Sequence, residues 1–306
     1  MIRIEFVIIF VLMIMNCAVN NKNLIDYPPK NTYKYSENIL INYEILGEGA
    51  KTIIFLHGFG ASLYSWNDIK FLFPATEYRL YLIDLKGFGY SSKPHDKKYT
   101  INEQSKIIAK FMESKALENV TLVGHSYGGG VALLTQLRFL DNPKIITKLI
   151  LLDCAAYPDD IPSFIDVLRN PILNFISLNL ISAHYRAEFT LKRIFYDLNK
   201  VTKEKILQYA KFFSINGAKY SFTQAAKQII PEDYERILQS YSEIETNTLI
   251  IWGEKDTAIP FKYGKKLHET LPKSQLEIIK KCGHVPHEEM PLQTYKLMEA
   301  FLGGTK

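Results

Sequence analysis

Cysteine is scarce in this chain of 306 residues, which contains only Cys17, Cys154 and Cys282. None of the three has the Cys-x-x-Cys spacing of a redox or metal site. Two cysteines on separate elements also make no disulfide framework. We therefore interpret Cys154 and Cys282 as buried or incidental residues, and we expect no metal centre.

Clusters of one charge are also missing. The 37 Lys and Arg residues stand against 32 Asp and Glu residues, which gives a net charge of +5, and the lysines are scattered along the chain. Nucleic-acid-binding domains gather their basic residues on one face, so we expect no nucleic acid as a partner. The hydrophobic content of 47%, with 13% aromatic residues, is ample for a substantial globular core.

The N-terminus carries an apolar run that is too short to cross a bilayer. Ten consecutive apolar residues, Phe6–Met15, follow Arg3 and end at Asn16 and Cys17. This length and order are typical of a signal peptide, which we expect to occupy residues 1–16. The ending resembles a bacterial lipoprotein signal in which cleavage leaves a lipidated cysteine, although Asn16 stands where a small residue is usual.

The polar stretch after this run is interpreted as a tether. It includes Pro28 and Pro29 and leads over residues 17–36 to the globular domain. We expect an exported protein of the bacterial cell envelope that meets the membrane surface through a lipid on Cys17. Secretion or a periplasmic location without the lipid, and an uncleaved N-terminal anchor, are the alternatives.

The middle of the chain holds a serine framed by glycines. The run Val120–Val123 is β-branched and aliphatic, as in a buried parallel strand, and helix-forming residues follow over 131–140. Between them Gly124, Ser126 and Gly128 form the Gly-x-Ser-x-Gly pattern of a nucleophile elbow. We expect a β-carbon at either glycine to collide with a neighbouring element, and the turn to lift the Ser126 hydroxyl out of the sheet.

Tyr127 follows the serine at the expected start of the helix. Its backbone amide would therefore point toward an oxyanion that develops beside Ser126, and the helix dipole would favour that charge. We predict that this amide, and not the phenol, serves the reaction.

Further apolar runs alternate with helical patterns. They predict strands over residues 38–46, 52–56, 79–85, 145–152, 248–252 and 275–279. Short connections between strands and helices indicate a doubly wound parallel sheet, with residues 38–46 as an antiparallel strand at its edge. From residue 157 to 241 no buried strand is evident. This segment is predicted to be an all-helical cap inserted between core segments 37–156 and 242–306.

Three polar residues follow predicted strands in an order that suits nucleophilic catalysis. A serine hydroxyl is a poor nucleophile, so it needs an imidazole to accept its proton and a carboxylate to orient that imidazole. Ser126, Asp256 and His284 occur in this order along the chain.

Five motifs make the chain similar to the α/β-hydrolase family, of the type with an inserted helical cap. They are HGFGAS from His57, DLKGFGYS from Asp84, GHSYGG from Gly124, WGEKD from Trp252 and GHVPHEEMP from Gly283. The resemblance runs from about residue 38 to 302. It implies a mostly parallel eight-stranded sheet that is flanked by helices.

Carried over residue by residue, the resemblance implies roles for five positions. Ser126 would be the nucleophile, His284 the general base and Asp256 its orienting acid, while the amides of Phe59 and Tyr127 would form the oxyanion hole. A histidine at the head of the first motif, His57, would brace its own loop and not take protons.

Other histidines and acids compete for these roles. The family pattern selects His284 over His287, because Glu289 and Pro291 follow at the expected spacing. We expect His125 to point away from the serine into the structure.

Two aspartates are alternatives to Asp256. Asp153 ends a strand at a position where some relatives carry the acid, so it stays open as a second candidate. Asp84 precedes the nucleophile in the chain, and we expect it to hold the following glycine loop by hydrogen bonds.

The resemblance implies a serine hydrolase that cleaves carboxylic esters through an acyl-enzyme, without metal or organic cofactor. The apolar cap and the tether favour lipophilic acyl esters as substrates. Alternatives on the same triad are perhydrolysis and cleavage of a carbon–carbon bond in a β-diketone, for which Arg186 or Arg193 would bind a dicarboxylate. A non-catalytic envelope lipoprotein of the same fold is a further alternative.

Overall fold

The computed structural model describes residues 29, 31–159 and 161–303. The predicted signal peptide over residues 1–16, the lipid site at Cys17 and most of the predicted tether lie outside these ranges. Within them, no helix combines the length and the apolar character that a membrane span requires. Cys154 and Cys282 are buried and unbridged, as expected.

Eight strands form one mostly parallel sheet, which confirms the predicted fold class. In chain order they are β1 (Asn31–Ser36), β2 (Ile39–Leu46), β3 (Lys51–Leu56), β4 (Tyr78–Ile83), β5 (Val120–His125), β6 (Ile146–Leu152), β7 (Asn247–Gly253) and β8 (Ser274–Ile279). Their spatial order is β1-β2-β4-β3-β5-β6-β7-β8. The pairs β1–β2 and β2–β4 are antiparallel and the others are parallel, so β5 lies inside the parallel part, between β3 and β6.

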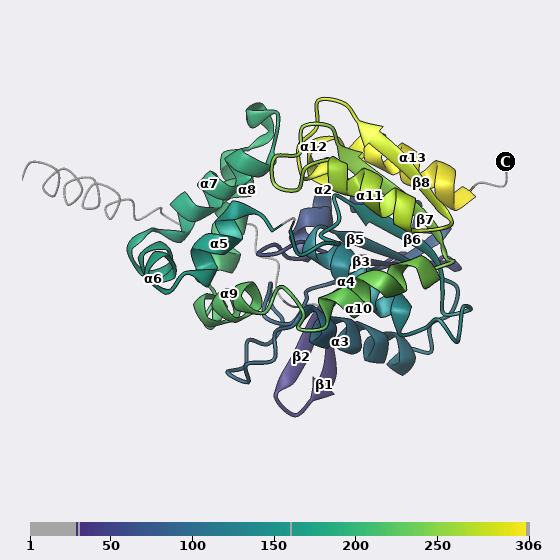
Figure 1. Cartoon of the computed structure of the whole chain (residues 1–306), viewed down its shortest axis with the longest axis horizontal. Coiled ribbons are helices and arrows are strands. Elements are labelled where there is room, and N and C mark those ends of the chain that lie inside the picture. Colours follow the sequence, from purple (N-terminus) through teal and green to yellow (C-terminus); the bar gives the residue numbers. More distant parts are fainter. Residues whose placement is uncertain (1–28, 30, 160, 304–306) are drawn as a thin grey trace, which may run out of the picture.

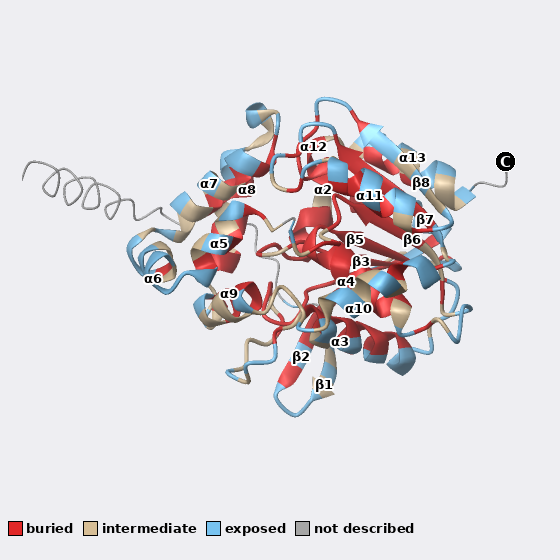
Figure 2. Ribbon diagram, in the orientation of Figure 1, coloured by how far each residue is buried: buried red, intermediate tan, exposed pale blue. Residues whose placement is uncertain are grey.

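The central strands are apolar on both sides because helices cover both faces of the sheet. In β3, Ile54 and Leu56 join one core, whereas Ile53 and Phe55 join the other. The first core is covered by α3 (Ile101–Ser114), α4 (Tyr127–Leu137) and α11 (Lys262–Thr270); the second is covered by η2 (Leu63–Trp66), α2 (Asn67–Lys70) and α13 (Pro291–Gly303). Figure 2 shows the buried strands as the red layer at the centre of the molecule.

The antiparallel edge of the sheet differs from the prediction. Residues 31–36 were assigned to the tether, but they form β1 and pair with β2. β2 is antiparallel as predicted, yet it lies between β1 and β4 and is not the edge. The ring of Tyr33 packs edge-on against Phe111 of α3 at 5.4 Å between centroids, and this long-range contact holds a strand whose sequence is too polar to reveal it.

Between β6 and β7 the described residues form helices and no strand. These are α5 (Ser163–Arg169), α6 (Pro171–Leu180), α7 (Ala183–Ile194), η3 (Leu198–Lys200), α8 (Lys203–Ser214), α9 (Ala218–Lys227), α10 (Tyr234–Ser240) and η4 (Tyr241–Glu243). We call residues 163–243 the helical insert. Helices α5 to α9 gather beside the sheet, on the left in Figure 1.

Candidate active site

A sharp turn between β5 and α4 presents Ser126. Its backbone has φ 50° and ψ −119°, a conformation that residues with a β-carbon rarely adopt. Both glycines are required, as predicted. A β-carbon on Gly124 would lie 2.4 Å from the carbonyl oxygen of Gly128, and one on Gly128 would lie 2.4 Å from that of Leu56.

Backbone hydrogen bonds hold this strained turn in place. The Ser126 amide donates to the Leu152 carbonyl at 2.9 Å, and the Ser126 carbonyl accepts from the amides of Gly129 at 2.8 Å and Ala155 at 3.0 Å. Tyr127 is the first residue of α4, so its amide is among the N–H groups that have no acceptor inside the helix. That amide is therefore available to a ligand beside the serine.

The loop after β3 lies against the serine. A β-carbon on Gly58 would stand 3.3 Å from the Ser126 β-carbon and 2.8 Å from a ring nitrogen of His125, so only glycine permits this approach. His57 braces the loop as expected: its Nδ1 donates to the Gly58 carbonyl at 2.8 Å, and its Nε2 accepts from the Leu85 amide at 3.0 Å. Burial lowers the pKa of His57, which keeps the ring neutral.

Asp84 has the structural role that was predicted for it. Its Oδ1 accepts from the Leu63 amide at 2.7 Å, and its Oδ2 accepts from the Tyr90 amide and the Asn42 side chain, each at 2.8 Å. The carboxylate thus joins the start of η2 to the glycine loop and has no bond to a histidine in these contacts.

Asp256 and His284 meet in the loops that follow β7 and β8. The Nδ1 of His284 donates to Oδ2 of Asp256 at 2.7 Å, and Oδ1 of Asp256 accepts from the amides of Ala258 at 2.8 Å and Ile259 at 2.9 Å. Both side chains are buried. Because Nδ1 is engaged, Nε2 is the nitrogen of His284 that is available to take a proton.

The alternative acid, Asp153, lies beside this pair. Its Oδ1 accepts from the Gly253 amide at 2.9 Å, and one ligand atom from each of Asp153, Asp256 and His284 lies within 4.8 Å of the other two. Burial, reinforced by the charge of Asp256, raises the pKa of Asp153 well above its usual range. The shift favours the protonated form of Asp153 over a wider pH range than an exposed aspartate has. Among the described residues these three are the only group spaced to hold a metal ion, but the bond to Asp256 already occupies Nδ1 of His284.

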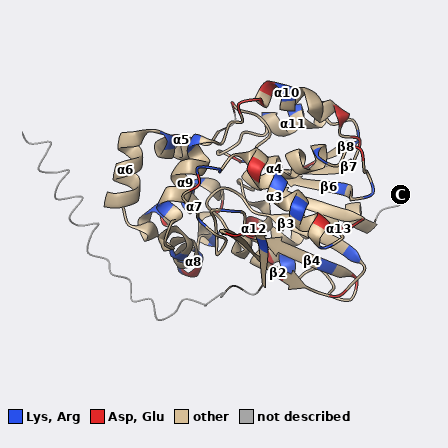
Figure 3. Cartoon of the chain, turned by 90° about the horizontal axis from the view of Figure 1, so that it is seen from below, with Lys and Arg blue, Asp and Glu red and all other residues tan. Residues whose placement is uncertain are grey.

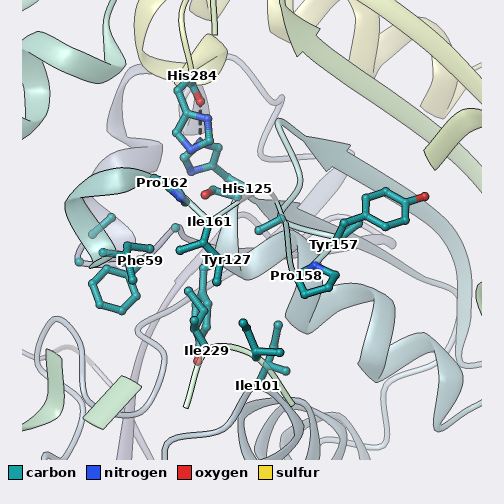
Figure 4. A pocket seen from close by; sticks show the side chains of 18 of the residues that line it. Phe59, Ile101, His125, Tyr127, Tyr157, Pro158, Ile161, Pro162, Ile229 and His284 are labelled. Carbon is teal, nitrogen blue, oxygen red and sulfur yellow. Dashed lines mark hydrogen bonds between the residues drawn. The ribbon is translucent and has the colours of Figure 1, made fainter. Parts of the chain in front are cut away.

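His125 and His287, the other histidines considered for the general base, have structural roles. Nε2 of His125 donates to the backbone carbonyl of His284 at 2.7 Å, the dashed line in Figure 4, so His125 holds the histidine loop. His287 stacks on Trp66 with ring centroids 4.3 Å apart, and among the described residues neither of its nitrogens has a hydrogen-bond partner. Burial lowers the pKa of both rings well below the usual range, so both are neutral.

A further carboxylate, Glu289, joins the histidine loop to the helical insert. It accepts from the Gly283 amide at 2.7 Å and from two amides of the insert, Tyr196 at 3.1 Å and Asp197 at 2.7 Å. In the sequence Glu289 is recognisable only as part of a family pattern, which does not predict this bridge. The spacing of Glu289 after the Gly-His pair was the only sign of a role in the sequence. This spacing does not reveal which distant amides bond the carboxylate.

The helical insert also contacts both loops of the acid and histidine pair directly. The His284 amide donates to the Ile194 carbonyl at 2.7 Å, and the Thr257 hydroxyl donates to the Arg193 carbonyl at 2.9 Å. The end of α7 therefore sets the backbone on either side of the bond between Asp256 and His284.

One cavity brings four of the five predicted site residues together, and Asp256 does not line it. Its wall includes Ser126, His284, Phe59 and Tyr127, and it encloses about 1030 Å³ of space, open solvent at its mouth included. Figure 4 shows His284 at one end of this cavity, with apolar side chains such as Ile229 at the opposite end. Its mostly apolar wall suits an apolar organic ligand.

A second cavity lies between α5, α6 and α7 and encloses about 1060 Å³ of space on the same measure. The two cavities share the wall residues Phe59, Gly60, Phe164, Thr190 and Phe213. Arg186 is the only charged residue that lines the second cavity in the described part of the chain. Its guanidinium stacks 5.9 Å from the centre of the Phe213 ring, and burial lowers its pKa.

Comparisons with known proteins agree on the fold. Lipase 3 of Moraxella sp. (strain TA144) is 28% identical over 271 residues, which are 87% of this chain and 80% of the lipase. The 2-hydroxy-6-oxo-2,4-heptadienoate hydrolase of Pseudomonas putida is 23% identical over 273 residues, 86% of this chain and 92% of the relative. The solved structure of the esterase EaEST from Exiguobacterium antarcticum superposes with a TM-score of 0.73 at 24% identity, over 87% of this chain and 96% of the esterase.

A family model provides the remaining comparison. The model described as the alpha/beta hydrolase fold matches residues 51–291, which include most of the sheet, the helical insert and the candidate site. On the evidence of this match and of the sheet topology, the chain belongs to the α/β-hydrolase family.

Proposed function

We propose that the protein is a serine hydrolase that cleaves carboxylic esters with lipophilic acyl groups. The observation that carries the proposal is the first cavity, which both Ser126 and His284 line. It joins a serine held at positive φ to a histidine whose Nδ1 is bonded to a buried carboxylate. Hydrolysis of an ester by serine needs these three groups and an oxyanion site, and no other group.

In the proposed reaction Ser126 Oγ attacks the ester carbonyl carbon while its proton passes to Nε2 of His284. The carbonyl electron pair moves onto oxygen, which the amides of Phe59 and Tyr127 stabilise. The ester carbon–oxygen bond then breaks, and His284 returns the proton to the leaving alkoxide. Water repeats the sequence on the acyl-enzyme, and Asp256 keeps the imidazolium oriented throughout.

The apolar walls support a lipophilic acyl group. Both cavities are lined mainly by aliphatic and aromatic side chains, which gain free energy from each methylene they remove from water. An envelope location, with a lipid on Cys17, is proposed on the sequence pattern alone and would place the enzyme near such esters.

The test is covalent labelling together with an ester panel. A fluorophosphonate probe should label Ser126, and Ser126→Ala should lose both the label and the hydrolysis of p-nitrophenyl esters while it still melts cooperatively. Labelling of another residue in the folded protein, or full esterase activity in Ser126→Ala, would refute the proposal.

A second candidate is hydrolysis of a carbon–carbon bond, and Arg186 favours it. Among the described residues its Nε has no hydrogen-bond partner, and it lines the second cavity, where it would suit a substrate carboxylate. Arg193, the other arginine predicted for this role, lines neither cavity. A 2-hydroxy-6-oxo-dienoate assayed beside an ester distinguishes the two reactions, and Arg186→Gln should weaken binding of the dienoate only.

A further inference from the structure

Helix α6 is apolar, exposed and free of charge. Its sequence, PILNFISLNL, has no Lys, Arg, Asp or Glu, and Leu178 is its only buried residue. The exposed fractions are 72% for Ile172 and 61% for Phe175. Folded proteins seldom leave side chains of this size together in water, so such a patch marks a surface that meets an apolar partner.

The helix has two apolar sides with different surroundings. Leu173, Ile176 and Leu178 line the second cavity, whereas Ile172 and Phe175 do not line it and project outward. On α7, Tyr185 and Phe189 are exposed and line the same cavity. One surface therefore continues from the outer face of α6 into a cavity that shares its wall with the serine.

The segment around the helix has a net basic charge. From Ser163 to Lys227 the chain has ten Lys and Arg residues against four Asp and Glu residues. Lys219 of α9 donates to the Asn179 side chain at 3.1 Å, and Arg169 directly precedes the α6 N-cap. Figure 3 shows α6 in tan, without a charged residue, among helices that carry basic ones. An uncharged apolar helix with basic neighbours fits the interface of an anionic bilayer.

We propose that α6 docks the helical insert on an anionic lipid surface, with Ile172 and Phe175 below the headgroups. The second cavity then receives an acyl chain from that surface and leads it toward Ser126. Docking rests on the apolar patch and on the net basic charge of its neighbours, whereas delivery of the chain rests on the proposed esterase function.

Local fluorescence in the full chain separates this docking from any membrane binding by the N-terminal segment. Trp66 and Trp252 have no exposed surface, so a tryptophan placed on α6 dominates the response to lipid. Phe175→Trp should shift to the blue on vesicles that contain phosphatidylglycerol, and dibrominated lipid should quench it. The shift should be weaker on pure phosphatidylcholine.

Phe71→Trp is the matched control, because Phe71 is 73% exposed at the end of α2 and is not part of the helical insert. We expect it to show neither shift nor quenching. Equal behaviour of the two variants would overturn the proposal. So would a blue shift of Phe175→Trp that grows with protein concentration in the absence of lipid, which would indicate a second copy of this chain as the partner.

Activity provides the second measurement. In Ile172→Glu/Phe175→Glu, the rate on a vesicle-embedded long-chain ester, divided by the rate on a soluble butyrate ester, should fall at least about tenfold, because each large apolar side chain contributes about a decade or more to membrane affinity. Phe71→Glu should keep the ratio of the wild type.

If Ser126→Ala hydrolyses both esters, the esterase proposal fails, and the fluorescence result still decides the docking. An unchanged ratio in the double variant contradicts delivery through α6.

Discussion

The loops at the sheet edge and the helical insert are built in opposite ways. Buried carboxylates fix the loops: Asp84, Asp256 and Glu289 each accept three hydrogen bonds or more. The insert is apolar instead. Of the fourteen large hydrophobic residues that are exposed in the described part of the chain, nine lie between residues 163 and 243. The loops are thus held by buried polar contacts, whereas the insert exposes apolar side chains at its surface.

The largest expected effect comes from the loops at the sheet edge, which hold His284. His284→Gln should lower kcat for a short ester by about 10⁴ to 10⁶, since the serine then has no base. His287→Gln, in the same loop, should stay within about tenfold, because that ring has no carboxylate partner in the described residues. Steady-state kinetics measure both variants, and a larger loss in His287→Gln would reverse the assignment.

The choice between the two acids is the next largest effect. Asp256→Asn should reduce kcat by about 10⁴, because the amide no longer holds the imidazole in its working tautomer. Asp153→Asn should cost less than about tenfold, since Asp153 Oδ1 bonds the Gly253 amide whereas the histidine bonds Asp256. Equal losses in the two variants would show that both carboxyl groups orient the histidine.

The Glu289 bridge between the histidine loop and the helical insert is tested by the free energy of unfolding. Glu289→Ala leaves the amides of Gly283, Tyr196 and Asp197 without their acceptor, which should lower the free energy of unfolding by about 3 kcal/mol or more. Denaturant unfolding measures this loss. Glu269→Ala, at an exposed position on α11, is the control and should change the value by less than about 0.5 kcal/mol.

The apolar interior of the helical insert is tested at Phe213, in the wall between the two cavities. Phe213 lines both of them, so Phe213→Ala should join their volumes and favour longer acyl chains. We expect the kcat/KM ratio of a C12 to a C4 ester to rise at least about tenfold, because one methylene in an apolar pocket already changes kcat/KM by about tenfold or more. An unchanged chain-length optimum would indicate that the acyl group does not pass this wall.

The last test is the pH dependence of stability. The pKa of Asp153 is raised by folding, so the folded state holds a proton that the unfolded chain releases above about pH 4. Stability from this group therefore falls as pH rises, by up to about 1.4 kcal/mol per pH unit. Asp153→Asn removes this dependence, so the free energy of unfolding of the variant relative to the wild type should increase as pH rises above about 4. A constant difference would mean that Asp153 is ionised in the folded protein.

Local pattern was sufficient for most of the fold. Strands such as Val120–Val123 are buried on both faces, which makes them continuously apolar and easy to recognise. The strand over residues 31–36 could not be predicted, because its polar sequence becomes a strand only by pairing with β2 and packing Tyr33 on Phe111. Local sequence carries no information about such partners.

By itself the sequence determined the turn at Ser126, because Gly124 and Gly128 are the only residues that fit its close backbone contacts. It also determined the chain order of Ser126, Asp256 and His284 and the apolar character of the insert. Only the tertiary structure decided that Asp256 and not Asp153 bonds the histidine, and that Glu289 joins the insert to the histidine loop. These outcomes depend on burial and on amides that are distant in the chain, and both arise only when the sheet and the insert are packed together.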